Sequence, residues 1–337
     1  MDNAKDNTTV ENTSRRDFIS KGAAVTGSLV AAAATVVAPA VAEAAAAPAQ
    51  AARPLSATEK FRALLKRPGL TVVPEAHSVF AARLAEINGY ECIYTGGNMI
   101  SAMHLGFDDY GIVTVNELIQ YGGHIARGVD IPAVVDSDQL GETALTVYRH
   151  TKEYQRAGIA AFHVEDTRNP KHQGAGVSSL MPVEEMVLRV QAASEARTDP
   201  NFTIIARSDS MGLFEKKGDL NELIRRGKAY AAAGADAFFP TGVKVEDINR
   251  ISDEVGIPVV TLNLPVNPQK ATKVKICLHA VQVFQPVMKL YEDMILGLKA
   301  TGEFPKPPRL PQETVDKVMH TAKYQELTAR WNKVRAG

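Results

Sequence analysis

Carboxylates stand at the ends of two strand-like segments in the middle of the sequence. The apolar run 133–136 ends on Asp136, Asp138 follows two residues later, and the run 160–165 ends on Glu165. Strand ends open into loops, where binding groups collect. If the two strands are neighbours in a parallel sheet, the three carboxylates converge, and oxygen ligands of this kind suit Mg2+, with Mn2+ as an alternative. The sequence therefore predicts a divalent-metal site, with Asp109 as a further carboxylate upstream.

A simpler interpretation exists for each of these acids. One carboxylate at a strand end can merely cap the next helix. Three of them on adjacent strands would repel one another unless a cation neutralised them, which favours the metal. His163, two residues before Glu165, is expected to be a hydrogen-bonded interior histidine and not a ligand.

Two other features could hold a substrate anion. The Thr-Gly-Gly segment 95–97 offers backbone N–H groups that can accept an oxyanion, although a Gly-Gly pair is also an ordinary turn. Arg207 ends an apolar run and needs an anionic partner, either a substrate carboxylate or an ion pair with Asp136 or Glu165. A metal, such a backbone nest and an arginine are together what a 2-oxo acid requires, because they stabilise the charge of an enolate.

Helical stretches alternate with eight short apolar runs from residue 58 onward. Three of the runs follow a helix-ending glycine: Gly89, Gly158 and Gly234. This repetition predicts a parallel sheet covered by helices, and eight strands favour an α/β fold of the (β/α)8 TIM-barrel type. The absence of Gly-x-Gly-x-x-Gly after the first run argues against a dinucleotide-binding fold. The expected strands are 70–74, 91–95, 133–136, 160–165, 203–207, 235–240, 258–263 and 280–284.

The N-terminal region is predicted to be a targeting segment. Residues 1–44 contain paired Arg15 and Arg16 before an uncharged run, which predicts a twin-arginine signal peptide, the twin-arginine translocase as a partner, and a periplasmic location. A membrane anchor is the alternative, but the run is rich in alanine and contains Pro39. Residues 45–57 are expected to be a flexible linker and 58–302 the catalytic barrel.

Residues 303–337 are expected to form a Pro-rich arm and a terminal helix over 313–334. These C-terminal helices either lie on their own barrel or are swapped between subunits of a homo-oligomer, a dimer of dimers.

Composition excludes one class of partner. Lys and Arg together number 38, as do Asp and Glu, and the body has no basic run, so nucleic-acid binding is not expected. Cys92 and Cys277 lie in apolar runs and are expected to be buried thiols.

Four motifs resemble the isocitrate lyase / phosphoenolpyruvate mutase superfamily over about residues 61–302. They are Val135–Asp138, His163–Asp166, Ile205–Asp209 and Ala233–Pro240. The resemblance implies a Mg2+-dependent barrel that cleaves C–C or P–C bonds of 2-oxo or 2-hydroxy carboxylates through an enolate. It assigns Asp109, Asp136, Asp138 and Glu165 to the metal site and its surroundings. It assigns the substrate to Thr95, Gly96, Gly97 and Arg207, and we expect Tyr94 and Asn263 at the same strand ends to line the pocket.

The loop after Glu165 departs from the pattern of the isocitrate and methylisocitrate lyases. Those enzymes carry a catalytic Cys where this chain has Gln173, and often a Glu where it has Thr241. The segment looks most like the Cys-free oxaloacetate decarboxylase branch. We expect Lys171, His172, Gln173 and Arg207 to be the catalytic side chains.

The sequence thus predicts a Mg2+-dependent lyase or decarboxylase that acts on a small 2-oxo or 2-hydroxy dicarboxylate through a pyruvate-type enolate. The alternatives are a phosphonopyruvate-type hydrolase or mutase, and a non-catalytic periplasmic carboxylate-binding protein.

Overall fold

A computed structural model describes residues 53–172, 180–212 and 218–332 of the chain. The predicted signal peptide and Gln173 therefore lie outside the described residues. Among the described helices, none is long and apolar enough to span a membrane.

Eight parallel strands of the described chain form a nearly closed barrel, as predicted. Neighbouring strands pair in the order β1-β8-β7-β6-β5-β4-β3-β2. A single bridge between Glu75 and Tyr94 links β1 to β2. The strands are β1 Thr71–Pro74, β2 Ile93–Thr95, β3 Ala133–Asp136, β4 Ala161–Glu165, β5 Thr203–Ser208, β6 Ala237–Pro240, β7 Val259–Leu262 and β8 Val274–His279.

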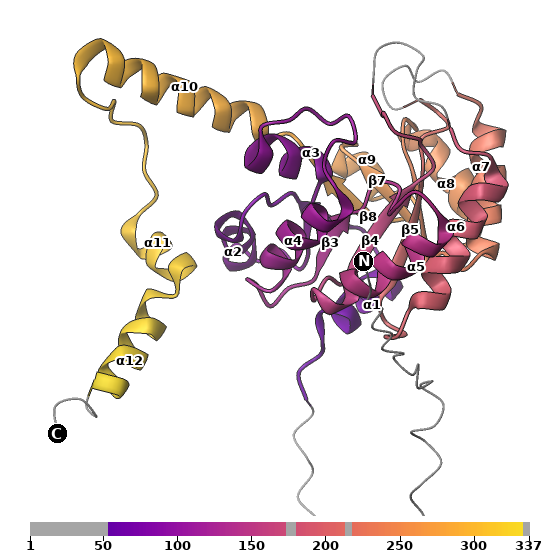
Figure 1. Cartoon of the computed structure of the whole chain (residues 1–337), viewed down its shortest axis with the longest axis horizontal. Helices are drawn as coiled ribbons and strands as arrows, with labels where there is room; N and C mark the ends of the chain where they lie inside the picture. The colour runs from indigo at the N-terminus through magenta and orange to yellow at the C-terminus, as the bar shows by residue number, and fades with distance from the viewer. Residues whose placement is uncertain (1–52, 173–179, 213–217, 333–337) are drawn as a thin grey trace, which may run out of the picture. The chain divides into compact units, whose positions relative to one another are not determined.

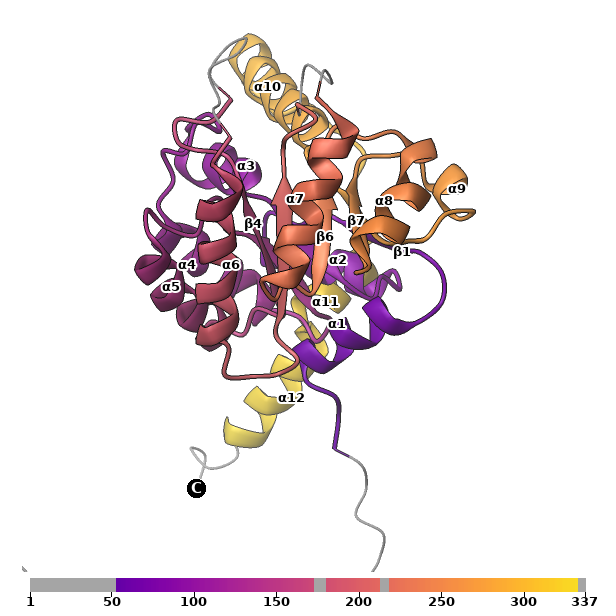
Figure 2. The ribbon, with the colours of Figure 1, turned by 90° about the vertical axis from the view of Figure 1, so that its right-hand side faces the viewer.

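Helices surround the strands, and Figures 1 and 2 show α4 to α8 side by side on the outside of the sheet. The longer helices are α1 Ala57–Lys66, α2 Val79–Ile87, α4 Val115–Ala126, α5 Ala144–Arg156, α6 Val183–Ala196, α7 Leu220–Ala232, α8 Ile248–Val255 and α10 Phe284–Thr301. Short α3 Gly97–Ile100 and α9 Val266–Gln269 sit in loops, and a π-helix, Ser101–Leu105, follows α3. Capping boxes begin α1 at Ser56, α4 at Thr114 and α5 at Thr143.

The core has two layers. One lies between the sheet and the outer helices and contains Phe162, Phe202 and Tyr154, whose rings meet edge to face. The other fills the barrel interior, where Phe61 of α1 is fully buried in the same cluster as Phe239. Both cysteines are buried free thiols, as expected.

Two expected elements were wrong. The eighth strand is β8, not residues 280–284, and Phe284 already begins α10. Lys275 interrupts the apolar pattern of β8 because its side chain is only half buried and its Nζ donates to Arg67 O over 3.2 Å. The terminal helix is divided into α11 Gln312–Met319 and α12 Thr321–Asn332, because His320 between them has a left-handed φ of 54°.

Candidate active site

Strand periodicity brings the polar strand ends together. Successive side chains of a strand point to opposite faces of a sheet. On β3, Val134 belongs to the barrel interior and Val135 to the layer under the helices, so Asp136 turns inward. The same alternation turns Glu165 of β4 and Arg207 of β5 inward, and these two residues are register partners. The three side chains therefore meet at the C-terminal ends of neighbouring strands.

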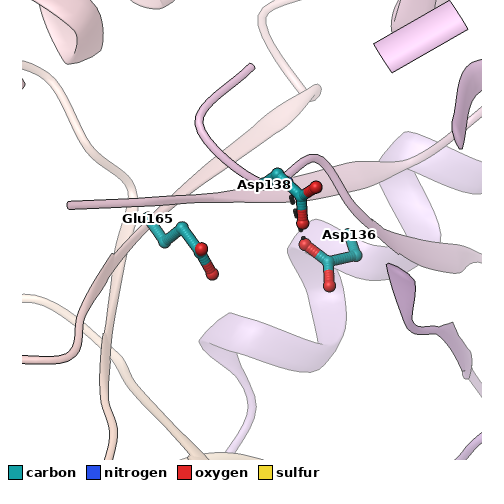
Figure 3. A group of neighbouring side chains, drawn as sticks. All are labelled: Asp136, Asp138 and Glu165. Atoms are coloured by element: carbon teal, nitrogen blue, oxygen red, sulfur yellow. Dashed lines mark hydrogen bonds between the residues drawn. The ribbon is translucent and has the colours of Figure 1, made fainter. Parts of the chain in front are cut away.

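The four predicted metal-site carboxylates lie together, and three of them surround one cation. Asp136, Asp138 and Glu165 are buried, and one oxygen of each lies within 4.8 Å of the others. Figure 3 shows these three side chains gathered in one place. The ammonium of Lys171 lies among them, with Nζ 2.5 Å from Asp138 Oδ1 and 3.8 Å from Glu165 Oε1. It also lies 3.1 Å from Asp109 Oδ1, so the cluster includes the fourth carboxylate.

The crowded charges perturb the cluster. Burial raises the pKa of Asp138 to about 7, with help from Asp136, Glu165 and Asp109, although Lys171 opposes the shift. Burial lowers the pKa of Lys171, but the surrounding carboxylates outweigh it and hold that pKa well above its ordinary value. Lys171 is thus protonated at neutral pH and supplies a charge and hydrogen-bond donors, not a base.

Asp136 is held as an anion by its neighbours. Burial raises its pKa, but the interactions with His163, Lys171 and Arg207 outweigh burial, and the pKa lies below its ordinary value. The backbone N–H of Gly97 donates to Oδ2 over 3.0 Å, and that of Asp138 donates to Oδ1 over 3.0 Å. The N–H of Gly97, predicted to bind a substrate oxyanion, is therefore used by Asp136, and Gly97 does not line the cavity described below.

His163 is the interior histidine that the sequence predicted. It is fully buried, and burial lowers its pKa, so the ring is neutral at pH 7. Its Nε2 lies 2.9 Å from the hydroxyl of Tyr94, and its Nδ1 lies 3.5 Å from Asp136 Oδ1. The ring therefore fixes the Tyr94 hydroxyl beside the carboxylates.

Arg207 is fully paired within the protein. Its Nε and Nη2 donate to the two oxygens of Asp209 over 2.9 and 2.8 Å, and its Nη1 lies 2.9 Å from Glu165 Oε2. The ion-pair interpretation thus holds for Glu165, with Asp209 as the bidentate partner. Thr241 donates to Asp209 Oδ1 over 2.7 Å. Arg207 is consequently a rigid cation whose position does not depend on a ligand.

Hydrogen bonds to Asp166 support the arrangement around Arg207. Asp166 accepts hydrogen bonds from Ser208 Oγ (2.7 Å), Asp209 N (3.0 Å), Arg226 Nη1 (3.0 Å) and Tyr230 Oη (2.8 Å). Four donors to one fully buried carboxylate fix the backbone beside Arg207.

A cavity of about 590 Å³ opens over the strand ends. Asp136 and Arg207 form a polar end, and the guanidinium carbon of Arg207 lies 5.6 Å from the ring centroid of Phe239. Much of the remaining wall is apolar and consists of Phe239, Val243, Leu262, Leu264 and Ala280. Such a cavity suits a small molecule with a carbon skeleton, and a divalent cation at the acids of its wall would let that molecule be anionic.

Some of the predicted substrate-binding residues line the cavity and others do not. Tyr94, Gly96, Arg207 and Asn263 line the cavity. Thr95 does not, because it follows the inward-facing Tyr94 on β2 and turns outward, where its hydroxyl donates to Ala76 O over 3.1 Å.

The amide of Asn263 is committed to the backbone. Its Nδ2 donates to Ala280 O over 3.1 Å, and its Oδ1 accepts from Ala280 N over 2.9 Å. It therefore holds the turn after β8.

The loop residues lie near the acids as far as the structure describes them. Lys171 is in the carboxylate cluster, and His172 lines the cavity with its Nε2 3.7 Å from Asp109 Oδ2. Gln173 lies outside the described residues.

Glu75, Asp166 and Asp209 were missing from the predicted site. Glu75 and Asp209 stand at strand ends like the residues that were chosen, so position alone was an available signal. Their roles are visible only in three dimensions, where Asp209 pairs with Arg207 and Glu75 accepts the N–H of Val281 in the turn after β8.

The donor set fits a hard divalent cation. Its members are carboxylate oxygens, which Mg2+ and Mn2+ prefer, and three acids around one ammonium, with Asp136 beside them, leave excess negative charge. A metal would share these oxygens with Lys171, so Lys171 must shift when one binds.

Comparison with known proteins gives a family. The sequence model of the phosphoenolpyruvate phosphomutase family matches residues 61–294. An oxaloacetate decarboxylase of Paraburkholderia xenovorans (strain LB400) is 31% identical over 286 residues, 82% of this chain and 94% of that protein. A 2,3-dimethylmalate lyase of Eubacterium barkeri is 34% identical over 205 residues, 60% of this chain and 69% of that protein.

A solved structure agrees. Phosphoenolpyruvate phosphomutase from Streptomyces platensis subsp. rosaceus superposes with a TM-score of 0.74 and 29% identity, over 81% of this chain and 98% of that one. The chain therefore belongs to the phosphoenolpyruvate mutase / isocitrate lyase superfamily, as an enzyme of the carbon–carbon lyase type.

Proposed function

We propose that the chain is a Mg2+-dependent lyase that cleaves a C–C bond of a small 2-oxo or 2-hydroxy dicarboxylate through a pyruvate-type enolate. The observation that carries this proposal is the set of buried carboxylates Asp136, Asp138 and Glu165 at the strand ends, beside Arg207 and the cavity. The named relatives support it, because one decarboxylates oxaloacetate and another is a dimethylmalate lyase. Decarboxylation of oxaloacetate is the first reaction to test.

Asp136, Asp138 and Glu165 would hold the metal, with Asp109 nearby. The bound cation would supply Lewis-acid stabilisation of the enolate oxygen. The protein's own residues bind and orient the substrate. Arg207 forms part of the polar wall beside the substrate, and because Asp209 fixes the guanidinium, little reorganisation is needed when the substrate arrives.

The cavity wall and Lys171 have different tasks. The apolar wall keeps water from the enolate and leaves space for the carbon skeleton. Lys171 carries its proton on Nζ and offsets negative charge that develops beside Asp138.

The test is a substrate panel. Oxaloacetate, 2,3-dimethylmalate, methylisocitrate and phosphonopyruvate are assayed for pyruvate formation with Mg2+ and with EDTA. We expect Mg2+-dependent pyruvate from at least one dicarboxylate, and at least about 1,000-fold less from the folded Asp138→Ala variant. Asp253→Ala, which changes an exposed acid, is the matched control. Activity that survives both EDTA and Asp138→Ala would refute the metal-dependent function, and pyruvate from phosphonopyruvate alone would point to P–C cleavage.

We also propose export by the twin-arginine route, on the strength of the paired Arg15 and Arg16 before the uncharged run. The Arg15→Lys, Arg16→Lys double variant is expected to stay in the cytoplasm of a bacterial host, as cell fractionation would reveal. Its normal appearance in the periplasm would contradict the proposal.

A further inference from the structure

Glu75 is a buried acid in the cavity wall that has no part in the proposed metal site. It directly follows β1 and forms the bridge to Tyr94 that joins β1 to β2. Its side chain lines the cavity, yet the residue is only 9% exposed. A glutamate this deeply buried is unusual unless its oxygens have partners.

One oxygen of Glu75 is held and the other is not. Oε2 accepts the backbone N–H of Val281 over 2.5 Å, from a turn in which Val281 has a left-handed φ of 58°. Asn263 fixes this turn through its two hydrogen bonds to Ala280. Oε1 is buried and accepts no well-aligned hydrogen bond from the described residues, although the nearby backbone N–H of Gly96 favours its charge. The carboxylate is thus anchored by one oxygen and leaves the other for a donor.

The free oxygen lies over the glycines of the α3 loop. A Cβ at position 96 would come within 2.6 Å of Glu75 Oε1, so only glycine leaves room for the carboxylate there. The next residue, Gly97, donates its N–H to Asp136 over 3.0 Å. A ligand oxygen above Gly96 therefore has the metal-site carboxylates on one side and Glu75 on the other.

The geometry points to Glu75 as a specificity-determining residue, which accepts a hydrogen bond at Oε1 from a hydroxyl group on the substrate's carbon chain. The proposal rests on the proposed function and narrows its substrate class to hydroxy dicarboxylates. A hydroxyl can turn its lone pairs toward the cation site and its O–H toward Glu75. A keto oxygen has no proton to offer, and an ionised Glu75 repels it.

Charge around the cavity supports this selection. Arg207 is already balanced by Asp209 and Glu165, so no described cation neutralises Glu75. Burial raises the pKa of Glu75 to about 7, while the backbone N–H groups of Val281 and Gly96 oppose the shift. At pH 8 the group is therefore mostly ionised and can only accept.

The experiment compares L-malate with succinate, which lacks the hydroxyl, by calorimetry at pH 8 with Mg2+. We expect the wild-type protein to prefer malate by at least about tenfold, since hydrogen bonds to charged groups contribute this much. Glu75→Met, similar in size but without an acceptor oxygen, should lose about tenfold of this preference. Glu75→Gln keeps its single oxygen on the Val281 N–H and places an NH2 group where Oε1 was, so it should also lose most of this preference. Val243→Ala, elsewhere in the cavity wall, is the matched control and should change both affinities alike.

An unchanged malate preference in Glu75→Met would overturn the inference, because metal chelation alone would then explain it. Equal binding of the two acids by the wild type, or no binding of malate, would also overturn it. Thermal unfolding shows whether each variant is folded. If Glu75→Met does not fold, Glu75→Gln replaces it as the test variant. The failure of this inference can be told apart from the failure of the proposed function. An enzyme that is active in the substrate panel but shows no Glu75-dependent preference for malate refutes only this inference.

Discussion

Lys171 and a divalent metal compete for the same oxygens. The ammonium is fully buried and lies within 4 Å of three carboxylates, so it already satisfies part of their charge. A metal held by Asp138 and Glu165 would compete with the ammonium for these oxygens and would have a positive charge beside it. The position of this one side chain therefore sets the metal affinity.

Removing the ammonium should strengthen metal binding. We expect Lys171→Met to tighten Mg2+ binding by about tenfold, equal to ~1.4 kcal/mol, because the competing cation is gone. Turnover should fall in the same variant, since no charge then offsets the developing anion. Calorimetric Mg2+ titration measures the first effect, and Lys152→Met, at a surface lysine, is the control. Weaker Mg2+ binding in Lys171→Met would show that Lys171 supports the metal and does not compete with it.

Glu75 should make stability depend on pH. Its folded-state pKa of about 7 lies above its ordinary value of 4.5, so between these values the folded state holds more protons than the unfolded state. Stability therefore falls as pH rises from 4.5 to 7, and above pH 7 the loss is complete. The difference between pKa values of 4.5 and about 7, at ~1.36 kcal/mol per pKa unit, gives a cost of at most about 3.4 kcal/mol.

Glu75→Gln removes this titration. Urea unfolding should find the variant more stable than the wild type at pH 8, with a much smaller difference at pH 5. Glu91→Gln, at an exposed glutamate paired with Arg67, should not reproduce the pattern. The interpretation fails if the difference in unfolding free energy between Glu75→Gln and the wild type is the same at pH 5 and pH 8.

Which site residues can be foreseen depends on where their partners lie in the chain. Asp136, Glu165 and Arg207 follow from strand alternation, which is a local pattern. Thr95 and Gly97 could not be assigned in this way. Their hydrogen bonds go to Ala76 and Asp136, and these partners are set by the barrel's closure and by the α3 loop.

At the level of elements, the barrel was predictable because it repeats. Seven expected strands overlap β1 to β7, since each is a largely apolar run, and β2 to β6 are buried on both faces. The eighth differs: Lys275 and His279 on β8 are only half buried. A strand whose outer face is only partly covered carries polar residues there, so β8 lacks the continuous apolar run that marks the other strands in the sequence.

Packing of α4 on β3 connects an element to the site. A Cβ at Gly122 would come within 2.5 Å of Val135 Cγ1, and valine is stiff. Gly122→Ala should therefore push α4 from the sheet and destabilise the protein by roughly 1–2 kcal/mol, despite alanine's better helix propensity. Because Val135 adjoins Asp136, Mg2+ affinity should fall as well. Urea unfolding and Mg2+ titration test both effects, with His124→Ala on the exposed face of α4 as control. A Gly122→Ala variant as stable as the wild type would mean that the helix can shift without cost.

At the scale of the whole molecule, α10 lacks a partner in the described chain. None of its residues is buried. Apolar side chains recur at three- and four-residue spacing along it, and Met288, Tyr291 and Ile295 are 48%, 63% and 60% exposed. By contrast, α11 is docked: Val318 is fully buried and its carbonyl accepts from Arg83 Nη1 over 3.1 Å.

We infer that α10 packs on a second copy of the chain. In a (β/α)8 barrel the helix after β8 would cover the outer face of β8, yet this face is only partly covered and α10 buries nothing. Exchange of α10 between two subunits would cover both surfaces in a closed, symmetric dimer. Two such dimers could then form the expected dimer of dimers.

The Tyr291→Asp, Ile295→Asp double variant tests this assembly. Charges on the apolar face should prevent burial of α10, so light scattering after gel filtration should report monomers where the wild type is a dimer or larger. The melting temperature of the wild type should rise with protein concentration, because association stabilises the folded state by mass action, and the variant should lose this dependence. Glu292→Lys changes charge on an exposed residue between the two and is the matched control. A wild-type chain that stays monomeric at every concentration would refute the exchange and leave α10 to fold onto its own barrel.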